Sequence, residues 1–334
     1  MSIEDLKIGE NNHLSIRGTD LVDLNQKYGS PLFVFDEVTL VNAFTKFLHA
    51  FHKNYPKLMI CYSIKTNNNL AICQLLREKG AYAEVSSELD LHVALRAGFH
   101  GDRMIFDGPF KPKEILRKAI GEKISLINVE SFEELARVNE IAGEMGVKQS
   151  VGIRVNPFKD SGLSKYVHIN ELSTAALCNL ECRFGFSVEQ AYSAFKHADG
   201  LKNVNIDAIM THPYRGATKV LLPMMRDLKE KFAAEIKYLN IGGGFNPGGA
   251  AFIGTNDLTI DFLRRKIGLK SKLPSRGRGT DIESVVKPIV EEIRQSIGDS
   301  PDLTIIVEPG RFITSASGIL LTKVDHVKNA GGYR

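Results

Sequence analysis

The sequence predicts an α/β protein: a (β/α)8 TIM barrel with a partial second β domain built from the N- and C-terminal segments. Three observations carry this prediction. Short apolar runs of strand character alternate with helical runs eight times. The alternation covers roughly 250 residues, the usual size of such a barrel. β-like segments also lie outside it at both ends. An open doubly wound sheet is the alternative, because periodicity alone does not separate it from a closed barrel.

Each expected strand is a short apolar run, and each of the first seven is followed by a segment of helical pattern. In chain order the strands are expected at 58–63, 82–87, 103–108, 124–130, 150–156, 203–211, 236–241 and 303–307. The helices are expected at 70–79, 91–97, 112–120, 131–145, 188–198, 222–235 and 281–297. Ser131 and Glu134 have the spacing of a capping box at the start of the fourth helix.

Two connections are long, 157–183 after the fifth strand and 245–280 after the seventh. Both follow the carboxyl ends of strands, where active sites of barrels lie. The basic run at 264–278 within the second connection is typical of a solvated mobile loop, and recruitment of an anionic substrate or carrier is the alternative.

The predicted domains are an N-terminal segment at 1–35 that contributes to the β domain, the barrel at 36–311, and the start of a C-terminal β domain at 312–334. The stretches 13–17 and 318–327 have β character, and Asn329-Ala-Gly-Gly332 has the composition of a hairpin turn with almost no return strand. We therefore expect the chain to stop inside the second domain.

The composition is that of a soluble globular protein, with 334 residues, 43% hydrophobic, 25% charged and a net charge of +4. This charge argues against nucleic acid as the main partner. With neither a membrane-spanning run nor a signal-peptide pattern, we expect a cytoplasmic protein without a membrane partner. Cys61 and Cys73 suit core packing. Cys178 and Cys182 could bind a metal or form a redox pair, but no second pair completes a zinc site, so no metal is predicted.

Lys65 is the most informative residue, because an apolar strand at 58–63 delivers it to the strand end. A lysine placed there either extends into water or serves chemistry. A partly desolvated amine loses its proton more easily and can form a Schiff base with a carbonyl cofactor.

Two loops have anion-binding character. Asn240-Ile-Gly-Gly-Gly-Phe245 follows the seventh strand, and its glycines let backbone N–H groups approach an anion closely. Glu308-Pro-Gly-Arg311 follows the eighth strand and places a carboxylate and a guanidinium at the two ends of a turn. A tight turn and a local salt bridge are the simpler interpretations. However, phosphate sites of barrels often form after strands seven and eight.

Three more polar residues lie on or at the end of predicted barrel strands: Glu84, Arg154 and His212. Charged residues on otherwise apolar strands need partners or a ligand. We expect them to share one rim with Lys65 and both loops, and this clustering favours the catalytic interpretation of Lys65.

These motifs resemble those of the fold-type III pyridoxal-phosphate decarboxylases, the family of diaminopimelate, ornithine and arginine decarboxylases. Tyr62-Ser-Ile-Lys-Thr-Asn67 resembles the family's cofactor-lysine motif, and the segments 240–245 and 308–311 resemble its phosphate loop and its pyridine-nitrogen motif. The resemblance spans roughly residues 30–325. It implies a cytoplasmic lyase that is a homodimer with active sites at the interface, takes an amino-acid substrate, and uses pyridoxal 5′-phosphate.

The resemblance also implies residue roles. Lys65 would form the Schiff base, Glu308 would pair with the pyridine nitrogen, and His212 would stack on the ring; these three would be catalytic. The remaining cofactor-binding residues would be Glu84, Arg154, Arg215, Gly242, Gly243, Gly244, Gly310 and Arg311.

The sequence departs from the family pattern in three places. His212-Pro-Tyr-Arg215-Gly216 replaces the usual His-x-Gly-Ser, so Arg215 stands where a serine helps to bind phosphate. The segment 160–183 does not resemble the diaminopimelate form. The C-terminal Cys-Glu-x-x-Asp-like motif and a later tyrosine are not found. A non-catalytic cofactor-binding or regulatory homologue is therefore the alternative function, and an amino-acid racemase ranks below it.

Overall fold

A computed structural model describes residues 6–157, 183–214, 216–247, 255–270, 281–297 and 302–328. The chain divides into two compact units. The larger comprises Lys46–Phe245 and Ile282–Gly310, and the smaller comprises Met1–Thr45, Asn246–Asp281 and Arg311–Arg334.

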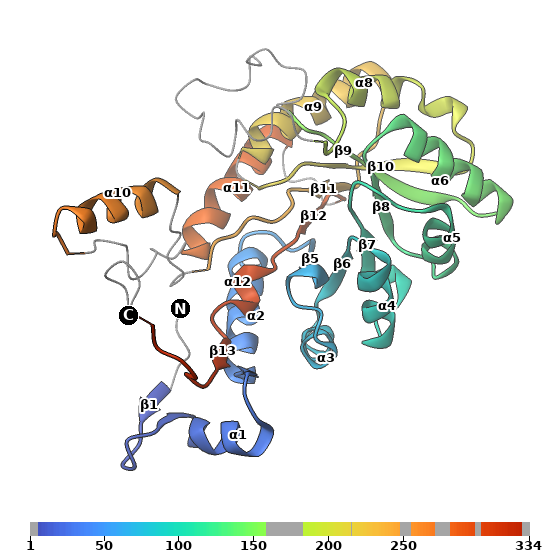
Figure 1. The fold of residues 1–334 in the computed structure, drawn as a ribbon. Coiled ribbons are helices and arrows are strands. Elements are labelled where there is room, and N and C mark those ends of the chain that lie inside the picture. Colours follow the sequence, from blue (N-terminus) through green and yellow to red (C-terminus); the bar gives the residue numbers. More distant parts are fainter. Residues whose placement is uncertain are drawn as a thin grey trace. The chain divides into compact units, whose positions relative to one another are not determined.

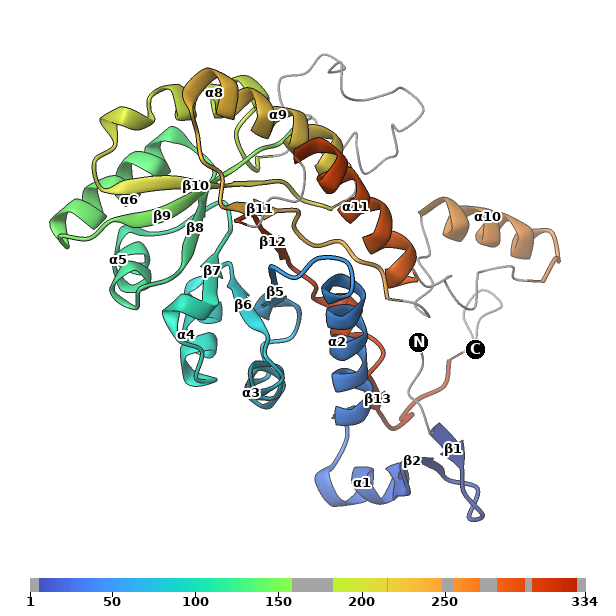
Figure 2. The same ribbon diagram turned by 180° about the vertical axis from the view of Figure 1, so that it is seen from behind.

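The larger unit is a closed eight-stranded barrel, with all neighbouring strands parallel (Figures 1 and 2). Its strands are β5 Leu58–Ser63, β6 Tyr82–Val85, β7 Met104–Phe106, β8 Leu126–Val129, β9 Gln149–Arg154, β10 Val204–Met210, β11 Tyr238–Asn240 and β12 Thr304–Val307. Pairing of β9 with β10 and of β12 with β5 completes the ring. The predicted barrel is confirmed, and the open-sheet alternative is wrong.

Helices follow the barrel strands in the expected alternation. They are α3 Leu70–Glu78, α4 Glu88–Arg96, α5 Lys113–Gly121, α6 Phe132–Glu144, α8 Val188–Lys196, α9 Ala217–Phe232 and α11 Ile282–Ile297, with α2 Glu37–His52 before β5. Short 3-10 turns occur at Ile64–Thr66, Gly101–Arg103 and Ala198–Gly200. The helical hydrogen bonds begin at capping residues such as Asn69, Ser87 and Ser131.

The capping box expected at α6 forms only in part. The Ser131 side chain accepts from the Glu134 N–H, as predicted. The Glu134 carboxylate instead accepts from the Glu130 N–H at 2.8 Å and from Lys111 Nζ at 2.8 Å. A buried ammonium is a stronger partner for the carboxylate than the cap N–H. A reciprocal capping box does form at α8, between Ser187 and Gln190.

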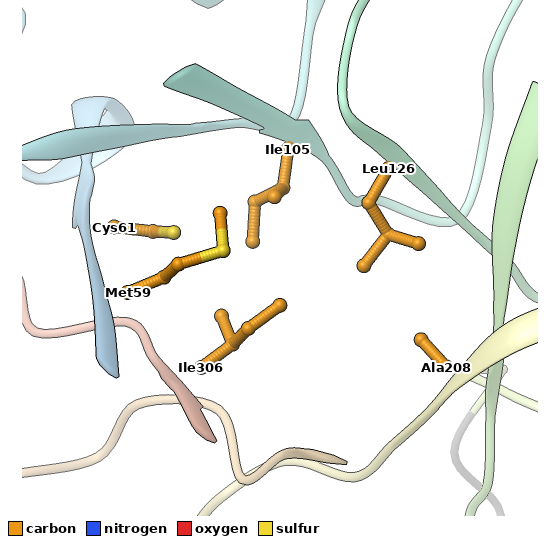
Figure 3. Packing of buried hydrophobic residues seen from close by; sticks show 6 residues of the cluster. All are labelled: Met59, Cys61, Ile105, Leu126, Ala208 and Ile306. Carbon is orange, nitrogen blue, oxygen red and sulfur yellow. The ribbon is translucent and has the colours of Figure 1, made fainter. Parts of the chain in front are cut away.

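The barrel interior is filled by apolar side chains that point inward from five strands (Figure 3). They are Met59, Cys61, Ile105, Leu126, Ala208 and Ile306. Tyr82 and Tyr238 pack against this cluster. Cys61 and Cys73 are buried and free, in agreement with a packing role. A filled interior leaves the carboxyl rim of the strands as the place for a site.

The smaller unit contains short antiparallel sheets. Its elements are β1 Leu6–Ile8, β2 Leu14–Ile16, β3 Thr19–Asp20, α1 Leu21–Tyr28, β4 Leu32–Phe35, α10 Thr255–Lys266, α12 Arg311–Thr314 and β13 Gly318–Leu321. Strand β13 pairs with β4, and Ile16 and Leu21 form a small core that Ile319 contacts. The β character expected at 13–17 and 318–327 is confirmed only over the shorter strands β2 and β13.

Helix α10 corrects the expectation of a mobile loop for the first three residues of the basic run 264–278. Residues 264–266 are its last turn, where Arg265 is bonded to the buried Asp261 at 2.7 Å. The i,i+4 pairing supports a helix that the basic composition concealed. Several expectations lie outside the described residues, namely those for 160–182, Cys178, Cys182, Arg215, 271–278 and 329–332. Over the described part of the chain, no helix combines the length and apolarity needed to cross a membrane.

Candidate active site

A cavity of about 360 Å³ lies at the carboxyl ends of the barrel strands. The residues that line it come from the ends of six strands and the segments that follow them. They are Lys65, Ser86, Asp107, Gly108, Pro109, Arg154, Val155, Asn156, Phe184, Met210, His212, Pro213 and Glu308. The cavity therefore brings together four of the sequence-predicted residues, and Glu84 joins them through a direct contact with Lys65.

Lys65 lies in the 3-10 turn that directly follows β5. Its Nζ donates to both carboxylate oxygens of Glu84, at 2.6 Å and 2.5 Å. Glu84 is fully buried on β6 and also accepts from the Ser63 hydroxyl at 2.5 Å. The Lys65 side chain is 54% exposed, so a ligand in the cavity can reach the amine.

The protonation of Lys65 is controlled by its neighbours. Burial by itself lowers the pKa of Lys65, but the carboxylates of Glu84 and Glu308 outweigh burial and raise it. The resting amine is therefore an ammonium ion. It must lose a proton before it can act as a nucleophile.

Glu308 directly follows β12 and is almost completely buried. One carboxyl oxygen accepts from the side-chain amide of Asn240 at 2.7 Å. Burial, followed by the carboxylates of Asp107 and Glu84, raises the pKa of Glu308 well above its ordinary value. A cationic ligand group beside Glu308 would lower this pKa and favour the carboxylate form.

His212 follows β10 and presents its ring to the cavity. Its Nδ1 accepts a hydrogen bond from the Gly243 N–H at 3.1 Å, which places the proton of a neutral ring on Nε2. Desolvation, together with the cations of Arg154 and Lys65, lowers the pKa of His212 to about 4. The ring is therefore neutral at physiological pH.

The glycine loop packs too tightly for side chains. A Cβ on Gly243 would lie 2.5 Å from the Glu308 carbonyl oxygen, and one on Gly242 would lie 2.7 Å from the Thr211 carbonyl oxygen. The Gly242 N–H donates to the Asn240 side chain at 2.8 Å. The N–H groups of Gly242 and Gly243 are thus both engaged within the protein, and neither glycine lines the cavity.

The other predicted phosphate residues are placed as follows. Gly244 is exposed and has φ +93°. Gly310 packs against the turn that carries Lys65, because a Cβ there would lie 2.0 Å from Thr66 Oγ1. Arg311 is the first residue of α12, which belongs to the smaller unit. Arg215 lies outside the described residues.

Arg154 lies at the end of β9 and is held from two sides. Its Nη1 donates to Glu130 at 2.6 Å, and its guanidinium carbon lies 4.6 Å from the centre of the Phe184 ring. Glu130 also accepts from the Gly185 N–H at 3.0 Å. These contacts fix the guanidinium at the cavity wall.

Asp107 is a cavity residue that the sequence did not single out. It follows β7, is almost fully buried, and accepts from the Asn128 side-chain amide at 2.5 Å. The only sequence signal was an aspartate before Gly108-Pro109 at a strand end, which is also an ordinary turn. With Glu84 and Glu308 it makes this end of the cavity acidic.

Comparison with known proteins identifies the family. The family described as "Pyridoxal-dependent decarboxylase, pyridoxal binding domain" matches residues 41–315. The chain belongs to the pyridoxal-dependent decarboxylases. It is a fold-type III enzyme of the amino-acid decarboxylase class, and pyridoxal 5′-phosphate is its cofactor.

Similar proteins agree with this assignment. The chain is 31% identical to a diaminopimelate decarboxylase of Aquifex aeolicus, with 95% of this chain and 68% of that protein covered. It is 30% identical to a diaminopimelate decarboxylase of Vibrio cholerae, with 96% of this chain and 69% of that protein covered. The crystal structure of diaminopimelate decarboxylase from M. jannaschii superposes with a TM-score of 0.80 at 26% identity, over 98% of this chain and 71% of that one.

The cavity of this pyridoxal-dependent decarboxylase fits its cofactor chemically. It offers an accessible amine at Lys65, a buried carboxyl at Glu308 whose pKa is raised, and the flat neutral ring of His212. Its volume is within the range of small-molecule sites.

Proposed function

We propose that this decarboxylase removes CO2 from an L-amino acid of the diaminopimelate type, with its cofactor attached covalently to Lys65. The observation that carries the proposal is the accessible Lys65 amine, paired with Glu84 at the open end of the barrel. When bound, pyridoxal phosphate supplies an electron sink for the electron pair that remains after CO2 leaves.

Lys65 and Glu84 act together in cofactor attachment. The Glu84 carboxylate holds the Lys65 ammonium in place and accepts its proton when the amine reacts. Transfer over a hydrogen bond of 2.6 Å requires no movement of either side chain. An incoming substrate amine then takes the position of the Lys65 amine.

Glu308 and His212 orient the cofactor ring. Glu308 would hold the protonated ring nitrogen of the bound cofactor, which would favour electron withdrawal towards that nitrogen. The neutral His212 ring, held by the Gly243 N–H, would stack on the cofactor ring. Gly244, Gly310, Arg215 and Arg311 are proposed for the phosphate, Gly242 and Gly243 for the tight packing of the loop that carries Gly244, and Arg154 for the pocket wall.

The relatives support the choice of substrate. Proteins similar over nearly the whole chain are diaminopimelate decarboxylases, and a crystal structure of the M. jannaschii enzyme, 25% identical here, is a co-complex with L-lysine. We therefore propose a diamino acid with a leaving α-carboxylate. Ornithine and related diamino acids form the alternative substrate set.

The decisive experiment follows CO2 release from diaminopimelate, ornithine, lysine, arginine and 2,3-diaminopropionate. Borohydride reduction followed by peptide mapping tests the attachment site in the same preparation. We expect CO2 release from at least one diamino acid and the reduced cofactor on Lys65. Cofactor bound without CO2 release from any substrate would favour the non-catalytic homologue.

A matched control is provided by Lys57, which lies just before β5 and pairs with Asp302 at 3.4 Å. Its side chain is about as exposed as that of Lys65, at 49% against 54%. Lys57→Met should keep both the label and the activity. A label on any lysine other than Lys65 would contradict the proposal.

The family resemblance also supports a cytoplasmic homodimer with active sites at the subunit interface. Sedimentation of the cofactor-loaded protein at several concentrations tests this assembly. A monomer at concentrations that give full activity would refute it.

A further inference from the structure

Lys111 is a charged residue that the proposed chemistry does not use. It lies in the segment between β7 and α5, and its side chain is fully buried. Its Nζ donates to the Gly108 carbonyl at 2.7 Å, the Asn128 carbonyl at 2.8 Å and Glu134 Oε1 at 2.8 Å. Three acceptors match the three N–H donors of an ammonium group. Lys111 therefore ties the segment after β7 to the end of β8 and to α6.

The contacts continue from Glu134 to the cavity. Glu134 Oε2 accepts from the Glu130 N–H at 2.8 Å. The Glu130 side chain in turn holds Arg154 and the Gly185 N–H. One buried ammonium is thus connected, through two glutamates, to the guanidinium at the cavity wall.

The same lysine also supports the part of the cavity wall that contains Asp107. Gly108, whose carbonyl it binds, lines the cavity between Asp107 and Pro109. Asn128, whose carbonyl it also binds, directs its side-chain amide to Asp107. Lys111 itself is absent from the cavity lining, so it can act there only through these neighbours.

A contribution to stability does not by itself explain why a lysine and a glutamate are buried here as an ion pair. Replacing a buried ion pair by apolar residues of similar volume is often neutral or stabilising. The distinctive feature of Lys111 is that its partners carry both Asp107 and Arg154. Gly108 follows β7, Asn128 lies on β8, and Glu134 on α6 is linked through Glu130 to Arg154 at the end of β9.

We propose that Lys111 is a positioning residue of the active site: through Gly108, Asn128 and Glu134 it sets the placement of Asp107 and Arg154. The inference goes beyond the proposed function, because it concerns how the cavity wall is held, whichever amino acid is the substrate. It predicts that the wall loses its order when Lys111 is replaced, even where the fold is retained.

The test compares Lys111→Met with the double variant Lys111→Met/Glu134→Gln. The single variant leaves the Glu134 carboxylate buried without its cation, so its stability falls. The double variant removes both charges and keeps an amide oxygen for the Glu130 N–H. The double variant should recover most of the stability that the single variant loses. It should therefore stay folded even where the single variant unfolds.

Three readouts are measured on the double variant: the dissociation constant of pyridoxal phosphate for the apoprotein, the separate values of kcat and KM, and hydrogen exchange at 107–111 and 183–187. We expect cofactor binding weakened about tenfold and kcat lowered about 10- to 100-fold, because small displacements of a site are costly. Exchange should be faster in both segments.

If a stable double variant kept wild-type cofactor affinity, kinetic constants and hydrogen exchange, Lys111 would serve only as a counterion of Glu134. That result would overturn the proposal. Cofactor affinity and hydrogen exchange need no turnover, so an incorrect substrate assignment would not affect them.

Asp207→Asn provides the control. Like Glu134, Asp207 is a buried acid that pairs with a lysine, at 2.9 Å from Lys237. It lies on the barrel strand β10, accepts from the Ser150 hydroxyl at 2.5 Å, and does not line the cavity. Its replacement should lower stability and leave cofactor affinity within about twofold. Equal losses of affinity in Asp207→Asn and in the Lys111 double variant would show a general effect of instability and would contradict positioning.

Discussion

Lys65 and Lys111 lie on the same barrel, and each bonds a buried glutamate, yet their surroundings are opposite. Lys65 is half exposed in the cavity, and its Nζ donates to both carboxylate oxygens of Glu84. Lys111 is fully buried, and its donors are shared among two carbonyls and Glu134. A lysine with every donor satisfied inside the protein is held in one place. A lysine that faces a cavity with a single carboxylate is available for chemistry.

The comparison separates two uses of an ion pair. In the pair of Lys65 and Glu84, the carboxylate raises the pKa of the lysine and provides a place for its proton. In the pair of Lys111 and Glu134, both carboxylate oxygens are occupied by donors from two segments. The first pair can exchange a proton with a ligand, and the second links backbone segments.

The largest expected effect comes from replacing the available lysine. Lys65→Met should lower kcat/KM by more than about 10³-fold, because the covalent step loses its nucleophile. The borohydride-stable label should disappear, as measured by mass spectrometry of the reduced protein. Activity within tenfold of wild type would show that Lys65 is not the attachment site.

Replacing the satisfied lysine should act first on stability. Lys111→Met should lower the free energy of unfolding by about 3–5 kcal/mol, because it leaves the buried Glu134 carboxylate without its cation. Urea unfolding of the apoprotein measures this value. A loss below about 1 kcal/mol would mean that water or another group readily replaces Lys111.

A smaller effect is expected at Gly152 on β9. A Cβ there would lie 2.1 Å from Asn128 Oδ1, and Asn128 is held in place by Asp107. Gly152→Ala should cost about 1–3 kcal/mol through overpacking and should displace Asp107. Both the midpoint of unfolding and the cofactor affinity should fall.

Gly121→Ala is the matched control for that substitution. Gly121 is the last residue of α5, and its Cβ would meet only Met145 Cε at an ordinary 3.6 Å. We expect no loss of stability, since alanine is the better helix former by up to about 1 kcal/mol. Equal destabilisation by both variants would show that the contact with Asn128 is not the cause.

Most of the barrel could be predicted because strand and helix periods differ and alternate along the chain. The predicted strand ends are less accurate. For example, the sequence predicts a strand over 236–241, whereas β11 comprises only Tyr238–Asn240. End residues of an apolar run remain apolar whether or not a neighbouring strand pairs with them. The charged last turn of helix α10 has the composition of a solvated loop, so the sequence predicts a loop there. The ion pair between Asp261 and Arg265, which supports the helix, is evident only from the structure.

The site was predictable where residues carry a motif and unpredictable where tertiary contacts decide. Lys65, His212 and Glu308 belong to recognisable segments, and the cavity contains all three. Asp107 has no motif, because its role depends on Asn128 from the neighbouring strand. Glu134 had the spacing of a capping residue, but Lys111 is distant in sequence and could not be anticipated as its partner.

The smallest expected effect concerns His212, whose folded pKa of about 4 lies below its ordinary value of 6.5. The unfolded chain therefore binds more protons at this residue between pH 6.5 and about 4, so His212 lowers stability as the pH falls through that range. Because the ring is open to solvent, we expect the effect to be only about 1 kcal/mol. His212→Gln apoprotein should lose less stability than wild type between pH 7 and 5 in urea unfolding. Parallel stability curves for the two proteins would mean that the ring titrates normally, so that neither desolvation nor the cations of Arg154 and Lys65 lower its pKa.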